Sequence, residues 1–155
     1  MNSYTNPGIS TFPETKVTGI STRTNNADEM SAAKGRIASI WSRFEQEIAP
    51  QLSEGNRVFG VYSEYESDHS GDFSVLAGTD QQNLDTEADF VSRTIPAGRY
   101  LVFNAEGELP MAIINAWQRV WSYFQQPDCP HERLYTTDFE HYSEKSGCYL
   151  YIAVK

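Results

Sequence analysis

The order strand, helix, strand, strand occurs twice along this chain of 155 residues. The letters WSRF at residues 41–44 return as WSYF at residues 121–124, at the same phase of a helical pattern. SEYE at residues 63–66 similarly returns as TDFE at residues 137–140. Because the two matches have different offsets, segments between them differ in length in the two copies. The sequence therefore predicts a diverged internal duplication.

The first copy begins with a segment of strand composition at residues 16–24. A helix is predicted within residues 25–50, because apolar residues recur there at intervals of three and four. These apolar residues are Ala33, Ile37, Ile40, Trp41, Phe44 and Ile48. Asn26 is the expected N-cap, since a short polar side chain can accept a hydrogen bond from the first turn. Residues 57–67 and 72–80 then read as two strands joined by a turn rich in Asp, Ser and Gly.

The second copy repeats this order. Residues 99–107 have strand composition, and residues 110–127 carry an apolar helical face bounded by proline at both ends. Residues 133–142 and 148–155 then form the last two predicted strands. A ligand groove shared by two such units is expected, because pockets favour the junctions between half-domains.

These elements predict one α+β domain at residues 15–155, after an irregular lead-in at residues 1–14 that contains Pro, Gly, Ser and Asn. The first half covers about residues 15–80 and the second about residues 96–155. Residues 81–95 are mostly polar and acidic and are expected to connect the halves. The two βαββ units would be related by a pseudo-two-fold axis.

The net charge of -9 and the sequence pI of about 4.7 oppose direct nucleic-acid binding, which depends on clustered Lys and Arg. Acidity instead biases the molecule toward cationic ligands. The N-terminus has no basic start followed by an apolar run, and no segment approaches the ~20 apolar residues of a membrane span. We therefore expect a cytoplasmic protein that does not bind membranes, with Cys129 and Cys148 as reduced thiols.

No motif for a cofactor or a metal ion is found. His69, His131 and His141 lack the spacing of metal ligands, and no cysteine pair completes a set. The sequence has no phosphate-binding loop, dinucleotide fingerprint, or serine or cysteine nucleophile motif. We expect no cofactor, no metal site and no covalent catalysis.

Glu140 stands among aromatic residues in a predicted strand. By strand parity it shares a face with Asp138 and Tyr142, whereas Phe139 and His141 point to the other face. On the residues alone, this face is either a solvated polar surface or part of an aromatic cleft. In a cleft, low solvation would make a cationic partner more favourable, and the carboxylate could also serve as a general base.

Four segments in order carry a family resemblance: FGVYSEYESDHSGDFSVLAG, IPAGRYLVF, AWQRVWSYF, and YTTDFEHY followed by YLYIAVK. They resemble the GyrI-like, AraC-type effector-binding superfamily, and within it the stand-alone integron-associated effector-binding proteins. The resemblance covers about residues 14–155. It implies duplicated βαββ units forming an antiparallel curved sheet, with a central cleft that binds small organic molecules, often hydrophobic cations. Relatives often carry this domain behind a DNA-binding helix-turn-helix, for which only about fifteen residues are present here.

On the matching motif, the resemblance places the counter-charge of the ligand at Glu140. Glu66, its mate in the repeat, is expected to be solvated because a turn begins there. Family clefts are lined by aromatic residues of strands and helices, which offer their ring faces to cations. The further ligand-binding residues that we expect are Tyr62, Tyr100, Tyr142, Tyr151, Trp41 and Trp121.

Three classes of function stay open at this stage. The residue content fits best a protein that captures a hydrophobic cation, either to sequester it or to deliver it to a partner regulator. The second class is a hydrolase of electrophilic small molecules in which Glu140 activates water, as the resemblance permits. The third is an acidic domain that inhibits a protein partner.

Overall fold

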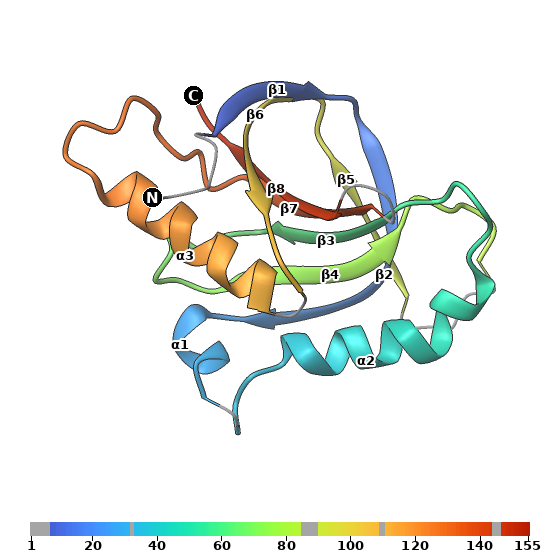
Figure 1. Ribbon diagram of the computed structural model, residues 1–155. Coiled ribbons are helices and arrows are strands. Elements are labelled where there is room, and N and C mark those ends of the chain that lie inside the picture. The colour runs from blue at the N-terminus through green and yellow to red at the C-terminus, as the bar shows by residue number, and fades with distance from the viewer. Residues whose placement is uncertain (1–6, 32, 85–89, 109–110, 144–146) are drawn as a thin grey trace.

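The fold is an antiparallel sheet of eight strands with two long helices on the same side of it (Figure 1). The computed structural model describes residues 7–31, 33–84, 90–108, 111–143 and 147–155. The strands are β1 (Gly8–Phe12), β2 (Thr15–Thr24), β3 (Val58–Ser63), β4 (Phe73–Thr79), β5 (Val91–Ile95), β6 (Gly98–Ala105), β7 (Thr137–Ser143) and β8 (Gly147–Ala153). The helices are α1 (Asn26–Glu29), α2 (Ile37–Glu47), the 3-10 turn η1 (Ala49–Gln51) and α3 (Met111–Gln125). Within the described residues, none of the helices is long and apolar enough to cross a membrane.

The strand order confirms the duplication. Along the sheet it runs β1-β6-β8-β7-β3-β4-β2-β5, so the three main strands of each copy form one half and β7 pairs with β3 at the centre. Helix α2 packs on β2 and β4, and α3 packs on the corresponding β6 and β8. The central strands β3 and β7 therefore lie between the two helices, which positions them as the floor of a cleft.

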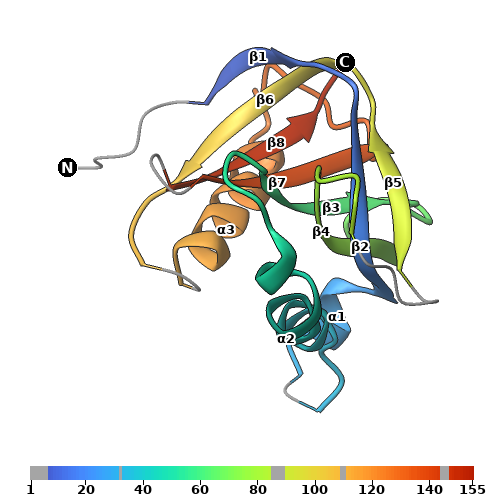
Figure 2. The ribbon, with the colours of Figure 1, turned by 90° about the vertical axis from the view of Figure 1, so that its right-hand side faces the viewer.

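Two strands had been expected as irregular chain. The predicted lead-in contains β1, which pairs with β6, and the predicted connection contains β5, which pairs with β2. Each copy thus adds a strand to the edge of the other copy's half. Figure 2 shows how these outer strands continue the curl of the sheet away from α2 and α3. Residues 1–6 of the lead-in and 85–89 of the connection lie outside the described residues.

The first predicted helix is shorter than expected and is interrupted. Asn25, not Asn26, caps α1, because its Oδ1 accepts a hydrogen bond from the backbone N–H of Asp28 at 2.8 Å. Ala33 lies outside both helices. The carboxylate of Glu29 then accepts the N–H groups of residues 36 and 37 at 2.8 and 3.2 Å, at the start of α2. Since no cap side chain adjoins α2 in the chain, Glu29 stabilises the free N–H groups of that helix from outside it.

The two faces of the sheet bury different clusters. Beneath the helices lie two apolar clusters, one under α2 and one under α3. On the opposite face, inside the curl, aromatic and aliphatic side chains form a third cluster. Its members are Phe12, Val17, Phe59, Val61, Leu76, Ile95, Tyr100, Phe139 and Ala153, with Val91 and Tyr151 packed against them. The alternation of strand residues between these faces decides which side chains can reach the cleft.

Candidate functional site

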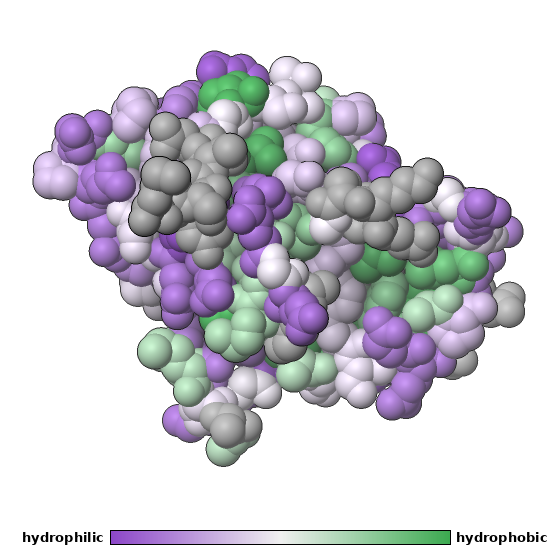
Figure 3. All heavy atoms as spheres, viewed as in Figure 1, coloured by the Kyte–Doolittle hydropathy of each residue, from purple (hydrophilic) through white to green (hydrophobic). Residues whose placement is uncertain are grey.

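A cleft of about 1860 Å³ lies between α2 and α3, over the central strands. Its walls come from both helices, its floor from β3 and β7, and one end from residues 52–58. Figure 3 shows apolar residues exposed among hydrophilic ones on this side of the molecule. A ligand in this space would contact both copies of the repeat, as expected for a site on a pseudo-two-fold axis.

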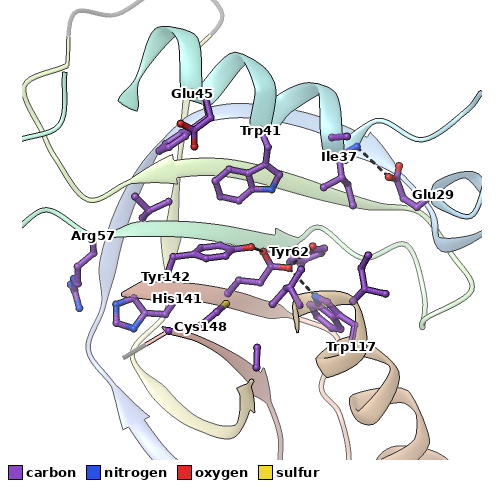
Figure 4. Close-up of a pocket in the computed structure, with 18 of the residues that line it drawn as sticks. Glu29, Ile37, Trp41, Glu45, Arg57, Tyr62, Trp117, His141, Tyr142 and Cys148 are labelled. Atoms are coloured by element: carbon purple, nitrogen blue, oxygen red, sulfur yellow. Dashed lines mark hydrogen bonds between the residues drawn. The ribbon is translucent and has the colours of Figure 1, made fainter. Parts of the chain in front are cut away.

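The carboxylate of Glu140 is buried in the floor, and three uncharged donors from separate elements converge on it. Tyr62 Oη of β3 and Trp117 Nε1 of α3 both donate to Glu140 Oε2 at 2.8 Å. Tyr142 Oη, two residues further along β7, donates to Glu140 Oε1 at 2.5 Å. Figure 4 shows the hydroxyls of Tyr62 and Tyr142 and the indole of Trp117 directed at one point. The three elements therefore converge on a single acidic group.

Burial raises the pKa of Glu140, while the hydrogen bonds from its three donors oppose that rise. The residue is 3% exposed, and within the described part of the chain no Lys, Arg or His forms an ion pair with it. The same burial, together with the nearby carboxylate, holds the pKa values of Tyr62 and Tyr142 well above their ordinary range. Both phenols consequently stay protonated and keep donating. Glu140 is a desolvated acid with hydrogen-bond partners but without a counter-ion.

Asp138, two residues earlier on β7, shows the contrasting arrangement. It is fully buried, but Arg133 Nη2 donates to its Oδ2 at 2.7 Å and the backbone N–H of Ala153 donates to its Oδ1 at 2.8 Å. Tyr65 Oη adds a third bond at 2.6 Å. Asp138 is thus neutralised within the fold, and Glu140 is the acid of β7 that lacks a cation.

Gly60 makes room for the carboxylate. It pairs with Glu140 across β3 and β7, so the two residues face the same side of the sheet. A Cβ on Gly60 would lie 2.6 Å from Glu140 Oε1 and 3.2 Å from Trp41 Cζ2. A side chain here would meet the carboxylate below and the indole above, which explains why glycine stands in the middle of this strand.

Aromatic rings form the walls around the acid. Trp41 of α2 stands edge-on to Tyr142, with ring centroids 5.3 Å apart, and Figure 4 shows it above that ring. Trp117 packs against Tyr62 at 4.9 Å. Trp121, one turn further along α3, also lines the cleft. Cys148 lines it as well, and burial, with a contribution from the nearby carboxylate, raises the pKa of its thiol, so the group stays protonated.

Five of the seven expected site residues line this cleft: Glu140, Tyr62, Tyr142, Trp41 and Trp121. The structure does not bring Tyr100 and Tyr151 there. Tyr151 pairs with Phe139 and stacks on its ring at 4.6 Å, so it faces the inside of the curl. The hydroxyl of Tyr100, in the same cluster, donates to the carbonyl oxygen of Pro96 at 2.6 Å.

Two contributors to the site were not expected from the sequence. Trp117 was not among the expected ligand-binding residues, although it lies one turn before Trp121 on the same helical face, and that spacing is the signal that could have revealed it. Gly60 has no local signal, because its role depends on the pairing of β3 with β7. Glu66, the mate of Glu140 in the repeat, is exposed beyond the end of β3, as expected.

Comparisons with known proteins agree with this architecture. Residues 8–154 match a protein family described as integron-associated effector binding protein. The crystal structure of the integron cassette protein VCH_CASS2, from the mobile metagenome of Vibrio cholerae, is 38% identical and superposes with a TM-score of 0.90 over 98% of this chain and 97% of that one.

A Bacillus subtilis protein named as a candidate transcriptional regulator, YobU, is 28% identical over 149 residues, which are 88% of this chain and 90% of that protein. The structure of SAV2435 bound to tetraphenylphosphonium has a TM-score of 0.68 at 18% identity and covers 97% of this chain and 94% of that one. At that level of identity it is evidence for a shared fold.

Proposed function

Since the chain belongs to the family of integron-associated effector-binding proteins, we propose that its cleft captures hydrophobic organic cations, with Glu140 as their counter-charge. One observation carries this proposal. Glu140 is a buried acid that accepts three hydrogen bonds and has no ion-pair partner among the described residues, and it lies beside a large aromatic-walled space. An unpaired buried charge is costly, and a cation entering the cleft would offset part of that cost.

The expected interaction energies of a bound cation are consistent with reversible binding. A cation about 6 Å from the carboxylate, at an effective dielectric constant of about 20, gains roughly 3 kcal/mol. Each aromatic face in contact with the cation adds ~0.5–2 kcal/mol. The rings of Trp41, Trp117, Tyr62 and Tyr142 all lie around the acid, so several such contacts can form at once. With apolar burial and the entropic cost of association, the sum corresponds to affinities of about micromolar.

Tetraphenylphosphonium is a suitable first ligand, because it carries a delocalised positive charge on an apolar aromatic body. Its presence in the structure of SAV2435, which shares this fold, supports the choice. All three tryptophans of the chain line the cleft, so binding is expected to change the intrinsic fluorescence. Triphenylphosphine oxide provides an uncharged aromatic of similar shape.

The test is a fluorescence titration of both ligands into the wild type and Glu140→Gln. We expect the substitution to weaken tetraphenylphosphonium by about 10–100-fold, which corresponds to roughly 1.4–2.8 kcal/mol, and to change triphenylphosphine oxide by less than about threefold. Glu66→Gln removes an exposed acid of the same charge and serves as the control. Equal affinity of wild type and Glu140→Gln for the cation would refute the counter-charge. Turnover of an aromatic ester that is lost in Glu140→Gln would favour a hydrolase instead.

A further inference from the structure

The charges that line the cleft bear on how many positive charges its ligand carries. We propose that the cleft selects elongated aromatic dications, with one positive charge at Glu140 and the second at Glu29. This inference rests on the proposed function and adds a ligand class and a second anchoring residue to it. It follows from the acids of the lining, their partners and their placement along α2.

The basic groups of the lining leave its negative charge uncompensated. Arg57 pairs with Asp80 at 2.9 Å, so this arginine is already neutralised by an acid outside the lining. Arg133 is neutralised in the same way by Asp138 at 2.7 Å. The described lining residues include no lysine. The remaining basic groups of the lining are two histidines, His69 and His141.

The acids of the lining differ from the arginines in having no charged partner. They are Glu29, Glu45, Glu54 and Glu140. Within the described part of the chain, none of them forms an ion pair with Lys, Arg or His. Glu45 and Glu54 are exposed, so water and salt screen their attraction for a ligand. Glu29 is half-buried, and a ligand would feel its charge more strongly.

Glu29 resembles Glu140 in being held by uncharged donors. Thr24 Oγ1 and the backbone N–H of Arg36 donate to its Oε2 at 2.6 and 2.8 Å. The backbone N–H of Ile37 donates to its Oε1 at 3.2 Å. The start of a helix carries only about half an elementary positive charge, so it offsets part of the charge of the carboxylate and not all of it. Glu29 is therefore fixed in place and still negative.

Glu29 and Glu140 act on the same stretch of the cleft. The hydroxyl of Tyr62 donates to Glu140, and the charge of Glu29 adds to the effects of burial and Glu140 that raise the pKa of Tyr62. Ile37 binds Glu29, and Trp41, four residues later, stands above Glu140, so the acids are offset by roughly 6 Å along the axis of α2. Figure 4 shows Glu29 at the end of the cleft beyond Ile37.

The cleft has room for a ligand that spans both acids. Its volume of about 1860 Å³ exceeds the ~300–1,000 Å³ of a typical ligand pocket. A compact cation at Glu140 would leave much of this space to water. Tyr62 and Trp117 lie beside Glu140, and Ile37 lies beside Glu29 (Figure 4), so an aromatic spacer between two charges would bury apolar surface.

The experiment compares two ligands of the same shape by isothermal titration calorimetry, at a pH where Glu140 is ionised. The dication is a biphenyl with a trimethylammoniomethyl group at each end. In the monocation, a carbon replaces one nitrogen, which gives an uncharged neopentyl group at that end. We expect the dication to bind the wild type at least about fivefold more tightly.

In Glu29→Gln, this ratio should fall to within about threefold and to less than half of its wild-type value, although the amide oxygen can still accept an N–H group of α2. Glu45→Gln removes an exposed acid of the lining and is the matched control, in which the ratio should stay within about twofold of the wild type. The two end groups differ in hydration equally in all variants, so the change in the ratio isolates the charge of Glu29.

Ala38→Lys covers the case in which Glu29→Gln fails to fold. Ala38 is exposed and lines the cleft one residue beyond Ile37, and it takes no part in the hydrogen bonds of Glu29. A lysine there would bring a positive charge to this end of the cleft. The ratio should therefore fall to about one or below.

A wild-type ratio near one overturns the inference, as does a ratio that neither Glu29→Gln nor Ala38→Lys lowers. A fall in Glu45→Gln as large as that in Glu29→Gln overturns it too. The proposed function stands in these cases if Glu140→Gln weakens both ligands. If both ligands bind Glu140→Gln as tightly as the wild type, the proposed function fails and the inference fails with it. Absence of binding by both ligands, when tetraphenylphosphonium still binds, overturns only the inference.

Discussion

Replacing Gly60 by alanine should disrupt the site from the floor of the cleft. The added methyl carbon would lie 2.6 Å from Glu140 Oε1, where ordinary contact begins at 3.4 Å, so the carboxylate would have to withdraw by about 0.8 Å. Its hydrogen bonds of 2.5 to 2.8 Å would lengthen by a similar amount and weaken. Overpacking costs ~1–3 kcal/mol, and weaker bonds to a buried charge cost ~1–3 kcal/mol.

Because alanine also reduces the entropy of the unfolded chain, we expect a net loss of about 2–4 kcal/mol in the free energy of unfolding. The assay is urea unfolding followed by tryptophan fluorescence, together with a titration of tetraphenylphosphonium, whose affinity should fall by about tenfold as the cleft narrows under Trp41. Gly98→Ala is the matched control, since a Cβ at that strand position has no atom within 4 Å. Wild-type stability and affinity in Gly60→Ala would refute this account of the glycine.

Three further predictions concern charged groups. Arg133→Met leaves Asp138 buried without its cation and should lower the free energy of unfolding, measured in urea, by ~3–5 kcal/mol. Lys155→Met removes the cation of an exposed ion pair and should change that free energy by less than ~1 kcal/mol. Similar losses in the two variants would contradict the difference between the buried and the exposed pair. Glu29→Ala removes the acceptor at the start of α2 and should lower stability by ~0.5–2 kcal/mol, and an unchanged unfolding curve would argue against this cap. Burial raises the pKa of Glu140 in the folded protein above its value in the unfolded chain, so ionising this residue lowers the stability of the fold. The stabilisation by Glu140 is therefore complete at a pH below its pKa in the unfolded chain, and it is lost as the pH rises through its pKa in the folded protein. Affinity for cations should rise through that same window, above the ordinary carboxyl range, in the wild type but not in Glu140→Gln.

The inner six strands and the two long helices could be predicted from the sequence, because the periodicity of one copy supports that of the other. The outer strands could not. β1 buries only Phe12 of its five residues and pairs with β6, which is distant in the chain. β5 likewise depends on its pairing with β2. An edge strand that is stabilised by a distant partner has little local pattern to reveal it.

The part of the candidate site that depends on the alternation of side chains within one strand could be predicted from the sequence. Parity placed Glu140 and Tyr142 on one face, and the structure joins them by a hydrogen bond. It could not decide which face of β6 or β8 meets the helices, and for this reason Tyr100 and Tyr151 were assigned to the wrong side. That choice depends on the register between strands, which pairs Tyr151 with Phe139, a member of the cluster on the face of the sheet away from the cleft.

The central claim is that Glu140 provides the charge that selects cations. The most direct measurement is the affinity of tetraphenylphosphonium for wild type, Glu140→Gln and Glu66→Gln by calorimetry, at a pH where Glu140 is ionised. We predict that Glu140→Gln binds about 10–100-fold more weakly, while Glu66→Gln stays within about threefold of the wild type. Equal losses in the two variants would mean that only the overall acidity of the protein attracts the cation. No loss in either would contradict a counter-charge at Glu140.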